Sequence, residues 1–252
     1  MSTAFQLDGR VALVTGANTG LGSAIAIALA RAGADIAAAG RSAPTDTERE
    51  VRALGRRFHA IECDFAERPV APEVVAATVA QLGRIDILVN NAGTIRRSDA
   101  LEFSEGDWDL VLDVNLKSVF FLSQAAAKAM LAGPGRGKIV NIASMLSFQG
   151  GIRVAAYTAS KSAIAGLTRL LANEWAARGI NVNAIAPGYF ATNNTTALRA
   201  DPDRSKEILA RIPAARWGDP ADIGGAAVFL ASAAADYVHG AILPVDGGWL
   251  AR

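Results

Sequence analysis

Short apolar runs bounded by turn residues recur along the chain and predict buried strands. These strands are expected at residues 11–14, 36–39, 59–63, 85–89, 139–142, 182–186 and 241–245. Their residues do not alternate between apolar and polar, which is typical of strands covered on both faces of a sheet. Helical segments are expected between the strands, at residues 21–31, 45–54, 72–82, 107–130, 157–177, 205–212 and 220–230.

This alternation predicts an α/β fold, with a doubly wound parallel sheet and helices on both of its faces. No linker, repeat or low-complexity tract divides the 252 residues, so residues 1–252 are expected to form a single domain. Ligands of such sheets bind beyond the carboxyl ends of the strands. The candidate chemistry is therefore sought where each strand ends.

The composition narrows the kinds of partner. Lys and Arg total 25 against 24 Asp and Glu and are scattered, so no surface for nucleic acid or an anionic membrane is expected. One cysteine, Cys63, and two distant histidines, His59 and His239, argue against a disulfide and a metal centre. The N-terminus lacks the pattern of a secretion signal and no run of about 18 apolar residues is evident, so a cytoplasmic protein acting on small molecules is expected.

A glycine-rich turn follows the first strand and opens an alanine-rich helix. Glycines permit a tight turn and close approach of the backbone to a pyrophosphate, whose charge is met by the N–H groups at the helix start. A purely structural turn is the alternative, and the order of strand, glycines and helix disfavours it. The candidate cofactor-binding residues in this turn are Gly16, Asn18, Thr19, Gly20, Leu21 and Gly22.

The ends of the second and third strands suggest how adenosine would be bound. Where a dinucleotide site usually carries an acid for the ribose, the chain has Arg41, which can pair with a 2′-phosphate and favours NADP. A solvated loop arginine is an equal alternative. Asp64, which is followed by Phe65, could accept a hydrogen bond from adenine or cap the next turn.

Tyr157 and Lys161 lie one helical turn apart on the same face of a predicted helix. A free phenol has a pKa of about 10, so acid/base chemistry near neutral pH needs a neighbouring cation. Ser144 follows the fifth strand and opens onto the same edge of the sheet. These three residues predict an acid/base site, the alternative being a chance pair on a solvated helix.

The chain resembles the short-chain dehydrogenase/reductase family along almost its whole length. The family's motifs occur in order, as Thr-Gly-x-x-x-Gly-x-Gly from Thr15 to Gly22, Asn-Asn-Ala-Gly from Asn90 to Gly93, then Asn115, Ser144, Tyr157-x-x-x-Lys161 and Pro187-Gly188. The resemblance implies a Rossmann fold, an NAD(P)-dependent oxidoreductase and a homotetramer.

The resemblance also implies roles for single residues. Tyr157 would be the general acid/base, and Ser144 would polarise the substrate carbonyl. Lys161 would lower the pKa of Tyr157 and hold the nicotinamide ribose, while Asn115 would bind a water that continues the proton relay. Further implied cofactor contacts are Asn91, Ala92, Gly93, Pro187, Gly188, Phe190 and Thr192.

Three stretches resemble a narrower branch, the sugar-acid dehydrogenases acting on 2-deoxygluconate or 2-dehydro-3-deoxygluconate. They begin at Asn90, Ala143 and Ala186. This branch is commonly NAD-linked, so the cofactor stays open between NADP and NAD. Arg97, Gln149 and Arg153 could bind the hydroxyls and carboxylate of such a substrate, or could be ordinary loop residues.

Residues 189–213, rich in Asn, Thr and charges, are expected to form a polar lid over the substrate.

Two rival functions remain. A 3-oxoacyl thioester reductase of the same fold should have an apolar lid, which Asn193 and Asn194 disfavour. A non-catalytic dinucleotide sensor would have no need of Tyr157 and Lys161 together. Trp108, Trp217 and Trp249, like His59 and Cys63, are assigned to packing, strand ends or subunit contacts.

Overall fold

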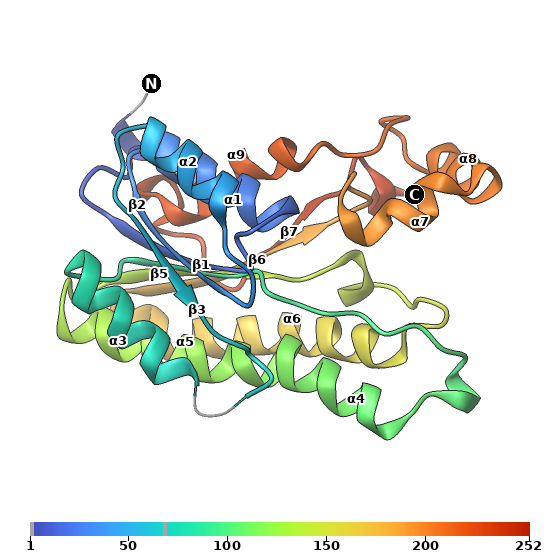
Figure 1. Cartoon of the computed structure of the whole chain (residues 1–252), viewed down its shortest axis with the longest axis horizontal. Coiled ribbons are helices and arrows are strands. Elements are labelled where there is room, and N and C mark those ends of the chain that lie inside the picture. Colours follow the sequence, from blue (N-terminus) through green and yellow to red (C-terminus); the bar gives the residue numbers. More distant parts are fainter. Residues whose placement is uncertain (1–2, 68–69) are drawn as a thin grey trace.

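The computed structural model describes residues 3–67 and 70–252, which fold into a three-layer α/β sandwich (Figure 1). Its seven strands pair in parallel in the order β3-β2-β1-β4-β5-β6-β7. The order reverses between β1 and β4, as in a doubly wound sheet, which confirms the predicted fold class. The strands are β1 Val11–Thr15, β2 Asp35–Gly40, β3 Phe58–Glu62, β4 Ile87–Asn90, β5 Gly137–Ile142, β6 Ile180–Pro187 and β7 Ile242–Val245.

Helices cover both faces of the sheet (Figure 1). One face carries α1 (Gly20–Arg31), α2 (Thr45–Ala53) and α9 (Gly224–Ala231). The other carries α3 (Val70–Leu82), α4 (Glu105–Leu112), α5 (Ser118–Ala132) and α6 (Ala155–Trp175). Two short helices, α7 (Thr196–Ala200) and α8 (Pro202–Arg211), extend beyond the carboxyl ends of the strands, near the C-terminus.

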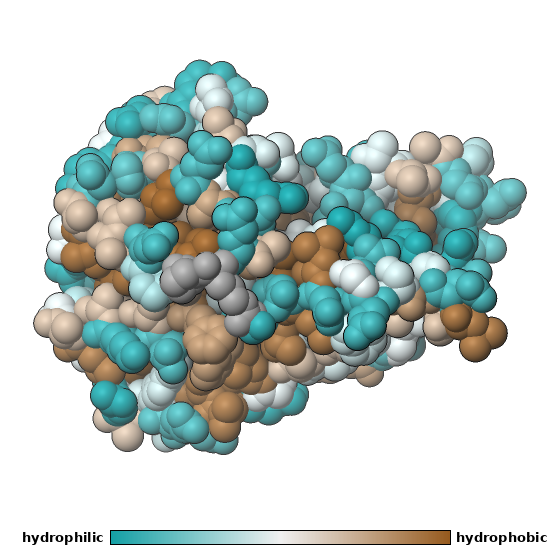
Figure 2. Space-filling model, turned by 60° about the horizontal axis from the view of Figure 1, so that its bottom comes forward, coloured by the Kyte–Doolittle hydropathy of each residue, from teal (hydrophilic) through white to brown (hydrophobic). Residues whose placement is uncertain are grey.

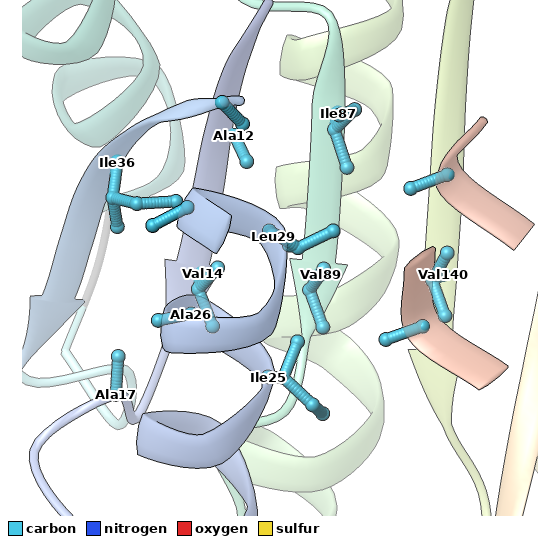
Figure 3. Packing of buried hydrophobic residues seen from close by; sticks show 14 of the residues in the cluster. Ala12, Val14, Ala17, Ile25, Ala26, Leu29, Ile36, Ile87, Val89 and Val140 are labelled. Atoms are coloured by element: carbon cyan, nitrogen blue, oxygen red, sulfur yellow. The ribbon is translucent and has the colours of Figure 1, made fainter. Parts of the chain in front are cut away.

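The packing of α1 on the sheet shows why the central strands are mostly apolar. Ile25 and Leu29 of α1 are fully buried against Val14 of β1 and Val89 of β4 (Figure 3). All five residues of β1 are buried, because helices cover both of its faces. Burial of each such side chain contributes about 1.5–3 kcal/mol, which fixes the start of α1 over the end of β1.

The helix expected over residues 107–130 is interrupted. α4 ends at Leu112, a single π-helical turn spans Asp113–Lys117, and α5 continues from Ser118. Hydrophobic periodicity does not reveal such a turn, because one extra residue leaves the apolar face on both sides nearly unchanged. The expected helix at residues 220–230 likewise begins with a 3-10 turn, and the helix α7 was missed altogether.

Together α4, the π-helical turn and α5 form a 28-residue helix from Glu105 to Ala132. By length and composition this helix could cross a membrane, and 39% of its most apolar window is buried inside the structure. Its middle carries Asp113 and Lys117, and a charge at the centre of a membrane helix costs about 2.5–3.5 kcal/mol. We therefore interpret this helix as one layer of the α/β sandwich.

Candidate active site

The glycine-rich turn forms a cradle between β1 and α1. Gly16 has a φ of +65°, a conformation that side chains rarely adopt. A Cβ atom on Gly22 would lie 2.2 Å from the carbonyl oxygen of Gly16 and 2.4 Å from Nδ2 of Asn91, so only glycine fits there. Thr19, just before α1, makes no capping hydrogen bond with its side chain. The cradle and the uncapped helix start fit a dinucleotide phosphate.

Asn91 and Thr15 hold the turn in place. Asn91 Nδ2 donates to the carbonyl oxygens of Thr15 (2.9 Å) and Gly16 (3.1 Å). The Thr15 hydroxyl accepts hydrogen bonds from the backbone N–H groups of Asn91 (3.0 Å) and Ala92 (2.9 Å). The side chain of Asn91, one of the implied cofactor contacts, thus holds the glycine-rich turn. In the sequence, this role of Thr15 was indicated only by its position as the first residue of the glycine motif.

Ser144, Tyr157 and Lys161 come together at the carboxyl end of β5. Ser144 lies beside the Tyr157 phenol as a hydrogen-bonding neighbour. Burial raises the pKa of Tyr157, whereas the Ser144 hydrogen bond and the positive charge of Arg97 act to lower it. Lys161 lies with Nζ 5.6 Å from the centre of the Tyr157 ring.

The ammonium group of Lys161 is held by the end of β5. Lys161 Nζ donates to the carbonyl oxygen of Ile142 at 2.6 Å, and burial lowers the pKa of this lysine to about 8. A buried ammonium must be hydrogen-bonded, and the Ile142 carbonyl supplies one acceptor for its three N–H donors. Two cations therefore lie near Tyr157, Lys161 with Nζ 5.6 Å from the ring centre and Arg97, whose positive charge acts to lower the pKa of the phenol.

Asn115 lies in the π-helical turn and is 1% exposed. Its Oδ1 accepts from the backbone N–H of Thr94 (2.8 Å), and its Nδ2 donates to the Thr94 carbonyl (2.9 Å) and to Ser160 Oγ (3.3 Å). A Cβ atom on Gly93 would approach Asn115 Oδ1 to 3.3 Å. Asn115 therefore links the loop after β4 to α6, through Ser160, which the sequence did not single out.

The structure brings Arg41 and Asp64 together at the other end of the candidate cofactor site. Arg41 is 74% exposed, with NH1 3.8 Å from Asp64 Oδ2. Asp64 Oδ1 accepts the backbone N–H of Ala66 at 2.9 Å, so the capping role considered for Asp64 is present. The side chain of Phe65 is buried in the core, which leaves its backbone to face a cofactor.

The segment after β6 reaches back to the glycine-rich turn. A Cβ atom on Gly188 would lie 2.6 Å from Cα of Asp246, so glycine is required where Pro187 ends the strand. Phe190 is buried, and the methyl group of Thr192 lies 3.5 Å from the position of a Cβ on Gly20. Thr192 thus lies against the start of α1, where the diphosphate was expected.

The three candidate substrate residues differ in their partners. Arg153, with a φ of +62°, is ion-paired to Asp99 at 3.2 Å. Gln149 Oε1 accepts hydrogen bonds from Trp249 Nε1 (3.3 Å) and Arg211 (3.4 Å). Within residues 3–67 and 70–252, Arg97 has no hydrogen bond or ion pair from its guanidinium.

The expected lid is polar only on its outer side. Ile208 and Ile212 of the α8 region are buried with Met145 and Trp249 in one apolar cluster. The guanidinium of Arg211 stacks on the Trp249 ring at 4.0 Å. The packing role predicted for Trp249 is thus confirmed, and segment 189–213 is anchored by apolar contacts beside Ser144.

Comparison with known proteins shows the family to which the chain belongs. A family model described as enoyl-(acyl carrier protein) reductase matches residues 16–250, and the chain belongs to the short-chain dehydrogenase/reductase family. This confirms the predicted enzyme class, an NAD(P)-dependent oxidoreductase acting on a CH–OH group. The 2-dehydro-3-deoxy-D-gluconate 5-dehydrogenase of Escherichia coli (strain K12) is 62% identical over 250 residues, covering 99% of either chain.

Solved structures are similarly close. A crystal structure from Agrobacterium tumefaciens with bound NADP is 63% identical, covers 99% of both chains and has a TM-score of 0.93. The gluconate 5-dehydrogenase from Burkholderia cenocepacia J2315, in complex with NADP and tartrate, is 41% identical, with a TM-score of 0.93. That similarity covers 99% of this chain and 98% of the other.

Proposed function

We propose that this protein is a sugar-acid dehydrogenase, acting on a secondary alcohol or ketone of a substrate of the 2-dehydro-3-deoxygluconate, 2-deoxygluconate or gluconate type. One observation carries the proposal. Ser144, as a hydrogen-bonding neighbour, and Arg97, by its positive charge, both act to lower the pKa of the Tyr157 phenol. A proton acceptor, a hydroxyl donor and a cation with no ion pair among the described residues together suit a substrate that carries both a carbinol and a carboxylate.

In this proposal each polar side chain has a separate task. Tyr157 takes the hydroxyl proton during oxidation and returns it during reduction, while Ser144 hydrogen-bonds to the substrate oxygen. The nicotinamide cofactor, when bound, accepts or supplies the hydride. Lys161 stabilises the phenolate and binds the nicotinamide ribose, and Asn115 holds a water that passes the proton onward.

The cofactor would lie along the carboxyl ends of β1, β2 and β4. The cradle at Gly16 and Gly22 and the uncapped start of α1 support binding of the diphosphate there. Thr192, packed beside Gly20, supplies a hydroxyl to the same group. Arg41 would contact a 2′-phosphate, so NADP binds measurably, with NAD as the alternative cofactor.

For the substrate, Arg97 is the preferred carboxylate ligand. Its guanidinium is unpaired within the described residues, whereas Arg153 is neutralised by Asp99 and Gln149 is held by Trp249. Segment 189–213 would act as the lid, closing on the substrate from the side of α8. Gln149 and Arg153 then bind the substrate only if they leave their present partners.

The direct test is a dehydrogenase screen of sugar acids with NADP and NAD in parallel. Turnover of a gluconate-type or 2-dehydro-3-deoxygluconate-type substrate supports the proposal, and a rate with other polyols that is equal or higher contradicts it. A 3-oxoacyl thioester is included, because the matching family description names an acyl carrier protein. Preference for the thioester would establish the rival activity.

The enzyme would assemble as a homotetramer in the cytoplasm. Figure 2 shows hydrophobic residues gathered on the face of α3 and α5, where a groove of about 870 Å³ includes Val75 and Phe121. Phe121 is 45% exposed and Trp108 39% exposed, so a second copy could cover them. Light scattering should give about 104 kDa, four times 26.1 kDa, and cell fractionation tests the compartment.

A further inference from the structure

Three hydrogen bonds tie the segment that carries Ser144 to helix α6. Before Ser144, the carbonyl oxygen of Ile142 accepts from Lys161 Nζ at 2.6 Å. After it, Ser147 Oγ donates to the carbonyl oxygen of Lys161 at 2.6 Å, and Ser162 Oγ donates to the carbonyl oxygen of Leu146 at 3.1 Å. The segment is therefore fixed to α6 on both sides of Ser144.

The tethers act close to the place where Ser144 meets the Tyr157 phenol. Ser144 has an extended backbone and begins the short 3-10 helix Met145–Ser147. Its hydroxyl accepts the backbone N–H of Leu146 at 3.1 Å. Because Leu146 also receives the hydrogen bond from Ser162, displacement of this turn relative to α6 would shift the Ser144 hydroxyl away from Tyr157.

The carbonyl oxygen of Lys161 has a hydrogen-bond partner even without Ser147. Lys161 lies inside α6, where each carbonyl already accepts an N–H from four residues further on. The hydroxyl of Ser147 is an additional donor that crosses from another element, and Ser147 is half-buried, whereas Ser162 is exposed. Water competes less for the Ser147 hydroxyl, so this tether is the stronger of the two.

We infer that Ser147 is a positioning residue, which holds the Ser144 hydroxyl in hydrogen-bonding distance of Tyr157, with Ser162 as a weaker second tether. The kinetic part of this inference rests on the proposed function. The geometric part does not, since the tethers from Ser147 and Ser162 and the nearness of Ser144 to Tyr157 are properties of the folded protein. Misplacement of a reacting group by about 1 Å can cost about a hundredfold in rate.

The kinetic test compares Ser147→Ala with Ser162→Ala and with the conservative Ser147→Thr. We expect Ser147→Ala to lower kcat by about five- to thirtyfold, with KM and the NADP Kd within about twofold of wild type. Ser162→Ala should lower kcat less than threefold, and Ser147→Thr should recover most of the activity. Ser232→Ala is the matched control, because it removes another hydroxyl donor to a carbonyl, that of Phe229 at 2.9 Å, in a different part of the fold.

A titration of the phenol tests the geometry without a substrate. The Ser144 hydrogen bond lowers the pKa of Tyr157, so loss of its alignment should raise that pKa. Ultraviolet difference spectra, with Tyr157→Phe as the reference, should therefore show a higher phenol pKa in Ser147→Ala and no change in Ser232→Ala. If wild type oxidises no sugar acid, this titration still decides the inference.

The double variant Ser144→Ala/Ser147→Ala completes the experiment. If Ser147 acts through Ser144, the second substitution causes no further loss of kcat once Ser144 is gone. Additive losses would overturn the inference. So would a Ser147→Ala enzyme whose kcat and phenol pKa match wild type while its Tm falls as in Ser232→Ala, since the tether would then be purely structural.

Discussion

Replacement of Arg41 by alanine tests how the protein distinguishes NADP from NAD. A charge-assisted hydrogen bond is worth about 1.5–3 kcal/mol, but Arg41 is 74% exposed, and solvent screening reduces such a contact. Arg41 also has a neighbouring anion, because Asp64 Oδ2 lies 3.8 Å from its guanidinium. The lower end of the range therefore applies, and Arg41→Ala should weaken NADP about tenfold and leave NAD unchanged.

The assay is calorimetric titration of both cofactors into wild type and variant at two salt concentrations. The difference in NADP affinity between wild type and Arg41→Ala should shrink at high salt, since the contact is electrostatic and exposed. Asp64→Asn is the counterpart, because asparagine keeps the Oδ1 acceptor for Ala66 and removes the charge near the 2′-phosphate. It should tighten NADP by a few-fold. Equal losses for NADP and NAD in Arg41→Ala, or no loss for either, would refute this reasoning.

Three further predictions concern the cradle and the acid/base pair. Tyr157→Phe should keep the fold and cofactor affinity but abolish turnover, and a variant retaining more than a few per cent of kcat would exclude Tyr157 as the acid/base. Gly22→Ala should destabilise the fold by about 1–3 kcal/mol and weaken the binding of NADP, because the new Cβ would lie 2.2 Å from the Gly16 carbonyl oxygen. Gly225 has open space around it, so Gly225→Ala should change neither stability nor NADP binding. Lys161 has a pKa of about 8 in the folded protein and 10.5 in the unfolded chain, so between these pH values the unfolded chain binds more protons. The free energy of unfolding of wild type, measured in urea and compared with that of Lys161→Met, should therefore increase from pH 8 to pH 10.5. A constant difference between wild type and this variant across that range would contradict the burial of a titrating lysine.

Most of the fold could be predicted from local patterns. Apolar runs such as the one that begins at Val11 located every strand to within a few residues, because the inner strands of the sheet are largely buried and mostly apolar. The edge strands β3 and β7 are only partly buried, so the prediction that the strands are covered on both faces is wrong for these two. The π-helical turn around Asn115 could not be predicted. It depends on hydrogen bonds with Thr94 and Ser160, which belong to other elements, and no periodicity within the helix records them.

The same division applies to the candidate site. The spacing of Tyr157 and Lys161 placed both on one helical face, and the strand ends brought Ser144 to the same edge. The partners of the charged side chains were not predictable. Arg153 pairs with Asp99 at 3.2 Å, so a residue considered for the substrate is already neutralised.

The sequence by itself determined the parallel sheet, the glycine cradle and the set of polar residues at the strand ends. These follow from local rules, since glycine is needed where the backbone turns sharply, and parallel strands bring all their carboxyl ends to one edge. Only the tertiary structure decided that Thr192 lies against Gly20, that the Lys161 ammonium faces Ile142, and that Arg97 acts on Tyr157. The physical reason is that desolvation, ion pairing and hydrogen bonding depend on distances between segments far apart in the chain, which local sequence patterns do not encode.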